Sequence, residues 1–140
     1  KLFSSLRAIW LFVKNDKGQL WIPRRDARKK ILPGALEGST VGHVSSGESY
    51  EESLLRETQE ELCINLRDHD YRYLGKVTPK DDGAFCFAQV YEVSLEDIPC
   101  WNKEDFSEFY WLTPQEIIER VNRGEKIKDS LLLMIKKFYL

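Results

Sequence analysis

The sequence predicts an α+β fold in which one mixed β-sheet has helices on both of its faces. The chain has 140 residues, of which 42% are hydrophobic, and this suits one domain with a real core. Apolar runs and turn signals follow one another as strand, strand, strand, helix, strand, strand, strand, helix, helix. Two hairpins and one crossover that contains a helix suggest the mixed sheet. The absence of repeats and linkers suggests one domain over residues 1–140.

The first half of the chain predicts a hairpin followed by a short strand. Residues 6–13 are apolar and β-branched enough for a buried strand. The sequence Asn-Asp-Lys-Gly at 15–18 signals a turn, and 19–22 resumes the strand character until Pro23 ends it. After a second turn, a short strand is expected over 35–41.

A helix is predicted next, over residues 49 to about 62. Ser49 and Glu52, three residues apart, have the form of a capping box at its start. Four residues at helical spacing form a stripe that should face the core: Leu54, Leu55, Thr58 and Leu62.

The same helix carries an acidic stripe, roughly 120° around the axis from the apolar one. Glu57 is a neighbour of Glu60 and Glu61 there, because they follow it by three and four residues. Like charges at this spacing destabilise a helix unless a cation lies among them. Carboxylate oxygens are hard ligands that suit Mg²⁺, with Mn²⁺ as the alternative, so the stripe predicts a divalent-cation site.

The second half predicts three strands and two helices. The strands are expected over 71–78, 84–93 and 108–112, and the helices over 113–124 and 129–139. In the second of these strands, residues of both parities are mostly apolar, so both of its faces are expected to be covered. Thr113 and Pro114 form a strong helix start, with threonine as the cap and proline at the first helical position.

Composition argues against several classes of partner. The formal net charge is −2, which implies no bulk attraction to a nucleic-acid polymer or to an anionic membrane. No apolar run is long enough for a membrane span, and the first residues enter a strand pattern directly rather than a signal peptide. Cys63, Cys86 and Cys100 are odd in number and widely spaced. That favours reduced thiols in a cytoplasmic protein over a disulfide framework or a zinc site.

A basic run follows the first hairpin, with five basic side chains among the seven residues 24–30. One interpretation is a solvated loop. The other is a phosphate site with Arg24, Arg25 and Lys30 as the candidate contributors, because arginine offers forked donors and lysine a point charge. The run alone leaves both interpretations open.

The stretch 42–64 resembles the Nudix box. Its fixed positions are Gly42, Glu48, Arg56, Glu57, Glu60 and Glu61, with five residues in the first gap and seven in the second. All six match the pattern of that box. Two positions depart from it, since Thr58 stands where an aliphatic residue is usual and Cys63 where a glycine usually ends the helix. The order of the strands on both sides of the box also fits the Nudix hydrolase superfamily, and the resemblance implies an α/β/α sandwich in which the box forms a loop, a helix and a loop.

The resemblance implies hydrolysis of a diphosphate linked to another moiety, such as a nucleoside, by attack of water at phosphorus with a divalent cation. By position, Glu57 and Glu61 resemble direct metal ligands of the family. Glu60 resembles a metal ligand or the base that activates the water, and the backbone carbonyl of Gly42 resembles a further ligand. The partner implied is a small-molecule diphosphate. A homodimer is compatible with the sequence, but no feature specifies one.

Other roles follow from the same resemblance. Arg56 and Glu48 resemble an ion pair that aims the glutamates. In several members of the family a late glutamate outside the box acts as a base or an extra ligand, and Glu104 is the first candidate, ahead of Asp105 and Glu108. Three aromatic residues nearby are candidates either for stacking on a ring of the substrate or for core packing: Trp101, Phe106 and Tyr110.

The basic run, followed by Gly42-His43, resembles the isopentenyl-diphosphate isomerase-like branch of the superfamily. In that branch the basic residues contact a diphosphate and the histidine can bind metal, so His43 is either a metal ligand or a structural hydrogen-bonding residue. The isomerase also needs a cysteine immediately before the Gly-His pair, where this chain has Val41. Because valine has no proton to transfer, a hydrolase is expected. The alternatives are a Nudix-fold module that binds without hydrolysis and an isomerase-like enzyme.

Overall fold

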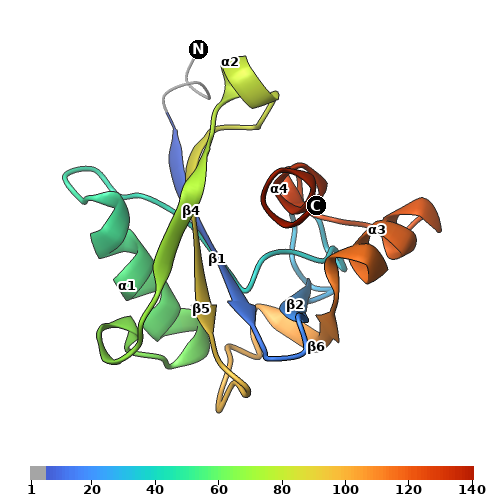
Figure 1. The fold of residues 1–140 in the computed structure, drawn as a ribbon, viewed down its shortest axis with the longest axis horizontal. Coiled ribbons are helices and arrows are strands. Elements are labelled where there is room, and N and C mark those ends of the chain that lie inside the picture. Colours follow the sequence, from blue (N-terminus) through green and yellow to red (C-terminus); the bar gives the residue numbers. More distant parts are fainter. Residues whose placement is uncertain (1–5) are drawn as a thin grey trace.

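The computed structural model describes residues 6–140, and its strands and helices follow one another in the predicted order (Figure 1). The strands are β1 (Arg7–Lys14), β2 (Leu20–Arg25), β3 (Thr40–His43), β4 (Arg72–Val77), β5 (Phe87–Ser94) and β6 (Phe106–Leu112). The helices are α1 (Tyr50–Leu62), α2 (Pro79–Asp82), α3 (Pro114–Asn122) and α4 (Leu131–Tyr139), with a 3₁₀ turn η2 (Leu66–Asp68). The two shortest, η2 and α2, lie in segments for which no helix was predicted.

The strands form one six-stranded mixed sheet, which confirms the predicted fold class. Its order is β4-β5-β1-β2-β6, and β3 pairs with β1 beside this path. The β1–β5 ladder is parallel, whereas β1–β2, β1–β3, β2–β6 and β4–β5 are antiparallel. One edge of β1 is shared, because Lys14 pairs with Leu20 of β2 while Ile9 pairs with Gly42 of β3. The sheet therefore places Gly42 beside a central strand, just before the chain enters α1.

The sheet has a hydrophobic core on each face, as the apolar pattern of its strands predicts. In β1, Trp10 and Phe12 pack toward α3 and α4, whereas Ile9 and Leu11 pack toward α1. Figure 1 shows α1 on one side of the strands and α3 with α4 on the other. All four of these β1 side chains are at most 3% exposed, so β1 contributes to the hydrophobic core on both faces of the sheet.

β2 and β3 differ from their predicted bounds. Pro23 was expected to end β2, but the strand continues to Arg25. Proline removes only a donor, and the Pro23 carbonyl still accepts a hydrogen bond from the Glu37 N–H at 3.1 Å. β3 begins at Thr40 rather than at residue 35, because Leu36 instead forms isolated bridges to β2 and to the segment before α4. This detour buries Glu37 beside the end of β2.

The caps of α1 and α3 confirm the predicted helix starts. Ser49 accepts from the Glu52 N–H at 3.0 Å, and the Glu52 carboxylate accepts from the Ser49 N–H at 2.8 Å. Thr113 and Glu116 form the same reciprocal pair at the start of α3. Over residues 6–140, no helix combines the length and the apolar character that crossing a membrane requires.

Candidate active site

Four segments of the chain meet at a pocket of about 370 Å³, here called the acidic pocket. They are the end of β2 with the loop after it, the turn into β3, helix α1, and the loop before β6. The lining consists of Arg25, Lys29, Glu37, Val41, Glu57, Glu60, Glu61, Asn102, Asp105 and Phe106. The structure therefore brings the three glutamates of the predicted acidic stripe to one pocket, together with two basic side chains.

Gly42 is not on the lining of the acidic pocket, but it lies directly against Glu57, which is. A methyl group at position 42 would overlap the Glu57 carboxylate, so only glycine leaves room for that side chain. The backbone of Gly42 does not have a positive φ, and its role here is therefore one of space rather than of conformation. This contact brings the Glu57 carboxylate to the backbone of Gly42, whose carbonyl is another of the predicted metal ligands.

Arg56 connects the two ends of the box. Its Nε and Nη2 atoms donate to the two carboxylate oxygens of Glu48, at 2.8 and 3.0 Å. The hydrogen bonds from Arg56 lower the pKa of Glu48 to about 2, so this carboxylate is ionised at neutral pH. The Nη1 atom of Arg56 lies 3.4 Å from Glu57 and 3.3 Å from Glu60. The pair thus has the geometry predicted for it, with one guanidinium orienting three carboxylates.

Glu61 is held from the opposite side by Asn102. The Asn102 Nδ2 atom donates to Glu61 Oε2 at 3.3 Å and to Asp105 Oδ2 at 3.0 Å, and its backbone N–H donates to the Glu61 carbonyl at 2.9 Å. Burial, together with the adjoining Asp105 carboxylate, raises the pKa of Glu61 to about 8. Burial likewise raises the pKa of Glu57. Negative charge is therefore disfavoured in this pocket unless positive charge accompanies it.

The side chains present fit a divalent cation by donor type, since carboxylate and carbonyl oxygens are hard ligands. The space beside Gly42 that a larger side chain would fill is taken up by the Glu57 carboxyl group, so an oxygen ligand lies against the Gly42 backbone. Within the described residues, no three acidic, histidine or cysteine side chains converge on a single point. Glu57 and Glu60 are turned to Arg56, and Glu61 is turned to Asn102, so gathering them around one ion requires side-chain rotation.

Only part of the basic run reaches the acidic pocket. Arg25 lines it and pairs with Glu37 at 3.0 Å, and Lys29 lines it and pairs with Asp105. Arg24, a predicted phosphate contact, instead donates to Glu125 at 2.8 Å and to the Gly34 carbonyl at 2.9 Å. Lys30, the third predicted contact, is exposed outside the lining. The geometry therefore supports Arg25 and adds Lys29, but gives no support to Arg24 or Lys30.

Comparison with known proteins agrees with this arrangement. The model of the NUDIX domain matches residues 5–132. The chain belongs to the Nudix family. A Nudix hydrolase of Nostoc sp. is 44% identical over 135 residues, which are 96% of this chain and 80% of that protein. A Nudix hydrolase of Deinococcus radiodurans is 37% identical over 134 residues, which are 96% of this chain and 78% of that protein.

Solved structures agree as well. The crystal structure of DR0079 from Deinococcus radiodurans has a TM-score of 0.95 at 36% identity, covering 99% of this chain and 85% of that one. A MutT protein from Methanosarcina mazei shares the fold at 18% identity, with a TM-score of 0.73 over 95% of this chain and 91% of that one. The protein is thus a Nudix hydrolase, a member of a family of diphosphate hydrolases that use divalent cations.

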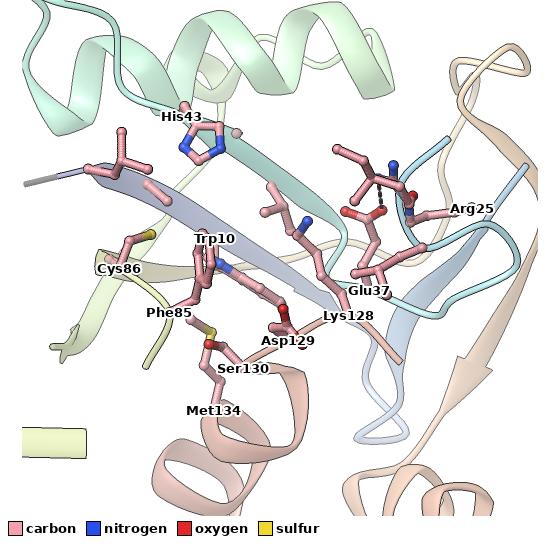
Figure 2. Close-up of a pocket in the computed structure, with 17 residues that line it drawn as sticks. Trp10, Arg25, Glu37, His43, Phe85, Cys86, Lys128, Asp129, Ser130 and Met134 are labelled. Carbon is pink, nitrogen blue, oxygen red and sulfur yellow. Dashed lines mark hydrogen bonds and ion pairs between the residues drawn. The ribbon is translucent and has the colours of Figure 1, made fainter. Parts of the chain in front are cut away.

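The Nudix hydrolase has a second cavity of about 480 Å³ on the α4 side of the sheet, here called the apolar cavity (Figure 2). Its walls are mostly hydrophobic: Leu6, Ala8, Trp10, Ile31, Leu32, Val41, Phe85, Ala88 and Met134. Arg25, Glu37 and Val41 line the acidic pocket as well, so the two spaces adjoin. His43 lies on the lining of the apolar cavity and not of the acidic pocket. Its predicted metal role therefore gains no support from this placement.

The loop before β6 contributes Asp105 to the acidic pocket and not Glu104, which was the first candidate for the acid outside the box. Glu104 is exposed and outside the lining, and its backbone N–H donates to Asn102 at 3.0 Å. Asp105, the next residue, lines the pocket beside Glu61. Glu108 accepts from the hydroxyl of Tyr110 at 2.7 Å, away from the pocket.

Of the three aromatic candidates, only Phe106 lines the acidic pocket. Trp101 packs edge-on against Phe109. Tyr110 lies between Arg24 and Arg120. Both are therefore placed for packing rather than for stacking on a ligand at this pocket.

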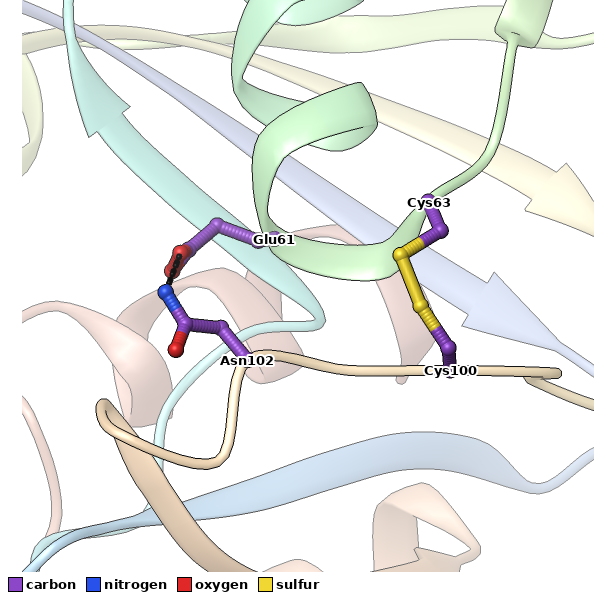
Figure 3. Close-up of a disulfide and its surroundings, with 4 residues drawn as sticks. All are labelled: Glu61, Cys63, Cys100 and Asn102. Carbon is purple, nitrogen blue, oxygen red and sulfur yellow. Dashed lines mark hydrogen bonds between the residues drawn. A yellow bond between two sulfur atoms is a disulfide. The ribbon is translucent and has the colours of Figure 1, made fainter.

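A disulfide joins Cys63 to Cys100 across a sequence separation of 37 (Figure 3). The expectation of reduced thiols is therefore wrong for these two residues, whereas Cys86 is free and buried. Wide spacing along the chain misled the prediction, because the hydrogen bond from the Asn102 N–H to the Glu61 carbonyl brings the two segments together in space. Figure 3 shows the disulfide and the Glu61–Asn102 contact side by side at the end of α1.

Proposed function

We propose that this Nudix hydrolase uses a divalent cation, Mg²⁺ or Mn²⁺, to hydrolyse a diphosphate linked to another small-molecule moiety, by attack of water at phosphorus. The observation that carries the proposal is the corner where the Glu57 carboxylate lies against Gly42, with Glu61 on the same pocket. Glu57, Glu61 and the Gly42 carbonyl would hold the cation. When bound, it supplies positive charge for the diphosphate and lowers the pKa of a coordinated water.

The chain's own residues have separate tasks in this reaction. Arg25 and Lys29 bind phosphate oxygens, because they are the cationic side chains on the lining of the pocket. Arg56 fixes the direction of Glu57 and Glu60 by charged contacts. Glu60 is the predicted ligand or proton acceptor, and at 57% exposure it is accessible to the attacking water. Asp105, rather than Glu104, is the acid outside the box that is placed to assist it.

Isomerase activity is the less favoured alternative, although the basic run and Gly42-His43 resemble the isomerase-like branch. Val41 lies on the wall shared by the acidic pocket and the apolar cavity. A valine there offers no proton for isomerisation, so the same site favours hydrolysis by water. A binding module without catalysis is the other alternative, and the retention of every acidic position of the box argues against it. We further propose that residues 1–140 act as one Nudix domain on a small molecule rather than on a nucleic-acid polymer.

The test is a panel of diphosphate compounds assayed with Mg²⁺, with Mn²⁺ and with a chelator. The panel should contain nucleoside triphosphates, sugar nucleotides, dinucleotides and isopentenyl diphosphate. Glu61→Gln should lower cation-dependent turnover by a factor on the order of 100 or more while the fold persists. Glu119→Gln is the matched control, because Glu119 is exposed on α3 and absent from the lining of the acidic pocket. Turnover that is indifferent to the cation, or unchanged in Glu61→Gln, would refute the proposal.

A further inference from the structure

We propose that Lys128 selects substrates whose non-phosphate part carries an oxygen acceptor, and that it binds this oxygen within the apolar cavity. The inference rests on the proposed function in one respect, namely that the diphosphate occupies the acidic pocket. Lys128 lies in the segment between α3 and α4 and is one of the 17 residues that line the cavity.

The backbone around Lys128 is fixed by the segment that carries Glu37. The Lys128 N–H donates to the Leu36 carbonyl at 2.8 Å, and the Leu36 N–H donates to the Lys126 carbonyl at 3.0 Å. The Lys128 carbonyl in turn accepts from the Leu131 N–H at the start of α4, at 3.1 Å. The backbone of Lys128 is therefore fixed beside the segment that carries Glu37, and its place on the cavity wall does not depend on a mobile loop.

The ammonium group of Lys128 has no bonded partner within residues 6–140. Glu37 is the buried carboxylate on the cavity wall, and it is paired with Arg25 at 3.0 Å. The charge of Lys128 opposes the rise that burial causes in the pKa of Glu37, but the two side chains form no direct ion pair. Asp129 is exposed, and no ion pair joins it to Lys128 either. Figure 2 shows the Lys128 side chain extending into the space between Trp10 and Glu37. A cation beside apolar walls gains more from a ligand oxygen than a fully solvated one does, because water competes less there.

The two pockets share a wall, so one ligand can reach both. Its phosphates would lie with Arg25 and Lys29, and the group attached to them would lie against Trp10 and Met134. The apolar walls favour a ring or chain with little charge, and the ammonium of Lys128 favours an oxygen on it, from either a carbonyl or an acidic group. An amine at the same place would be repelled by the ammonium.

Calorimetric binding with Mg²⁺ tests this without turnover. The probes are the phenyl, 4-acetylphenyl and 4-carboxyphenyl esters of methylenediphosphonate, which cannot be hydrolysed between the phosphorus atoms. The wild-type protein should bind at least one of the two oxygen-bearing esters about 10- to 100-fold more tightly than the phenyl ester, the range of a hydrogen bond to a charged group. A gain for the acetyl ester identifies a neutral carbonyl as the preferred oxygen, and a gain for the carboxy ester alone identifies an anionic group.

Lys128→Met should abolish this preference and leave the affinity for the phenyl ester unchanged. Lys126→Met is the matched control, because Lys126 is exposed, lies two residues away and is absent from the cavity lining. It should retain the preference. Equal binding of the three esters by the wild type, or a preference that persists in Lys128→Met, would overturn the inference. Neither result bears on the proposed function, which is tested separately by the cation dependence of turnover and by Glu61→Gln.

Discussion

Breaking the Cys63–Cys100 disulfide should destabilise this Nudix hydrolase strongly without unfolding its native contacts. Cys100→Ser is the suitable change, because Cys100 lies in an exposed loop, whereas Cys63 also serves as the cap of α1. In the native state the loop is still held by Asn102, whose N–H donates to the Glu61 carbonyl at 2.9 Å. The main effect is therefore expected in the unfolded chain, which the disulfide shortens and restricts.

The size of the effect follows from the length of the closed loop. For a separation of 37 residues, the loss of chain entropy on cross-linking is about 13 cal/mol/K. At room temperature this corresponds to about 3.8 kcal/mol of stability in the folded protein. Such a contribution is a large part of the total free energy of unfolding of a typical domain, which is about 5–15 kcal/mol.

The assay is urea unfolding followed by tryptophan fluorescence, with and without dithiothreitol. The reductant should lower the unfolding free energy of the wild-type protein by about 3.8 kcal/mol and should have no effect on Cys100→Ser. Cys86→Ala is the control, because Cys86 is a free thiol and its variant should keep the full response to reductant. A wild-type protein that is indifferent to dithiothreitol, or a Cys100→Ser variant within about 1 kcal/mol of it, would show the reasoning to be mistaken.

Three further outcomes are expected. Gly42→Ala should displace Glu57 and lower cation-dependent turnover by about tenfold or more, with cation titration showing weaker binding and urea unfolding little changed. Arg24→Ala should lower the free energy of unfolding by about 2 kcal/mol, because its bonds to Glu125 are lost, and should leave KM unchanged. Arg25→Ala should instead raise KM. A raised KM in Arg24→Ala with no change in Arg25→Ala would show that Arg24, and not Arg25, binds the phosphate. The hydrogen bond from Arg24 lowers the pKa of Glu125 below its ordinary value of 4.5, so its contribution to stability is present above pH 4.5 and is lost as the pH falls through the lowered pKa. In Glu125→Gln the free energy of unfolding should therefore fall less steeply as the pH is lowered below 4.5. A pH dependence equal to that of the wild-type protein in this range would contradict the assignment.

The fold was predictable to the extent that local signals determine it. The capping residues Ser49 and Thr113 each form side-chain bonds that are complete within three residues, so the sequence identifies both helix starts. The bounds of β2 and β3 were not predictable in the same way. Whether a strand continues past Pro23 depends on its pairing with β6, where Arg24 lies opposite Glu108 and Arg25 opposite Phe106, and no local pattern reveals so distant a partner.

The residues of the site likewise differ in whether a local pattern predicts them. Glu57, Glu60 and Glu61 lie within one helix, so their spacing alone places them on one pocket. Glu37 and Asn102 were missed, because a single acid or amide in a loop carries no signal until the fold brings it to the box.

In two other segments the prediction named the correct loop but a residue one position away from the one that lines the pocket. Lys29 lines the pocket rather than Lys30, and Asp105 rather than Glu104. Composition identifies a charged loop, but only its backbone path decides which side chain points inward.

The charge balance of the site explains why a fold would tolerate so many acids at one place. Six carboxylates lie in or beside the acidic pocket: Glu37, Glu48, Glu57, Glu60, Glu61 and Asp105. Arg25, Lys29 and Arg56 form ion pairs with them, and the charge of Lys128 acts on Glu37 from the apolar cavity, so two negative charges remain unbalanced if every carboxyl is ionised. Burial raises the pKa of both Glu57 and Glu61, so their ionised forms require added positive charge. A divalent cation would balance the two that remain, and this supports the proposed role of the box as a cation site rather than as a solvated helix face.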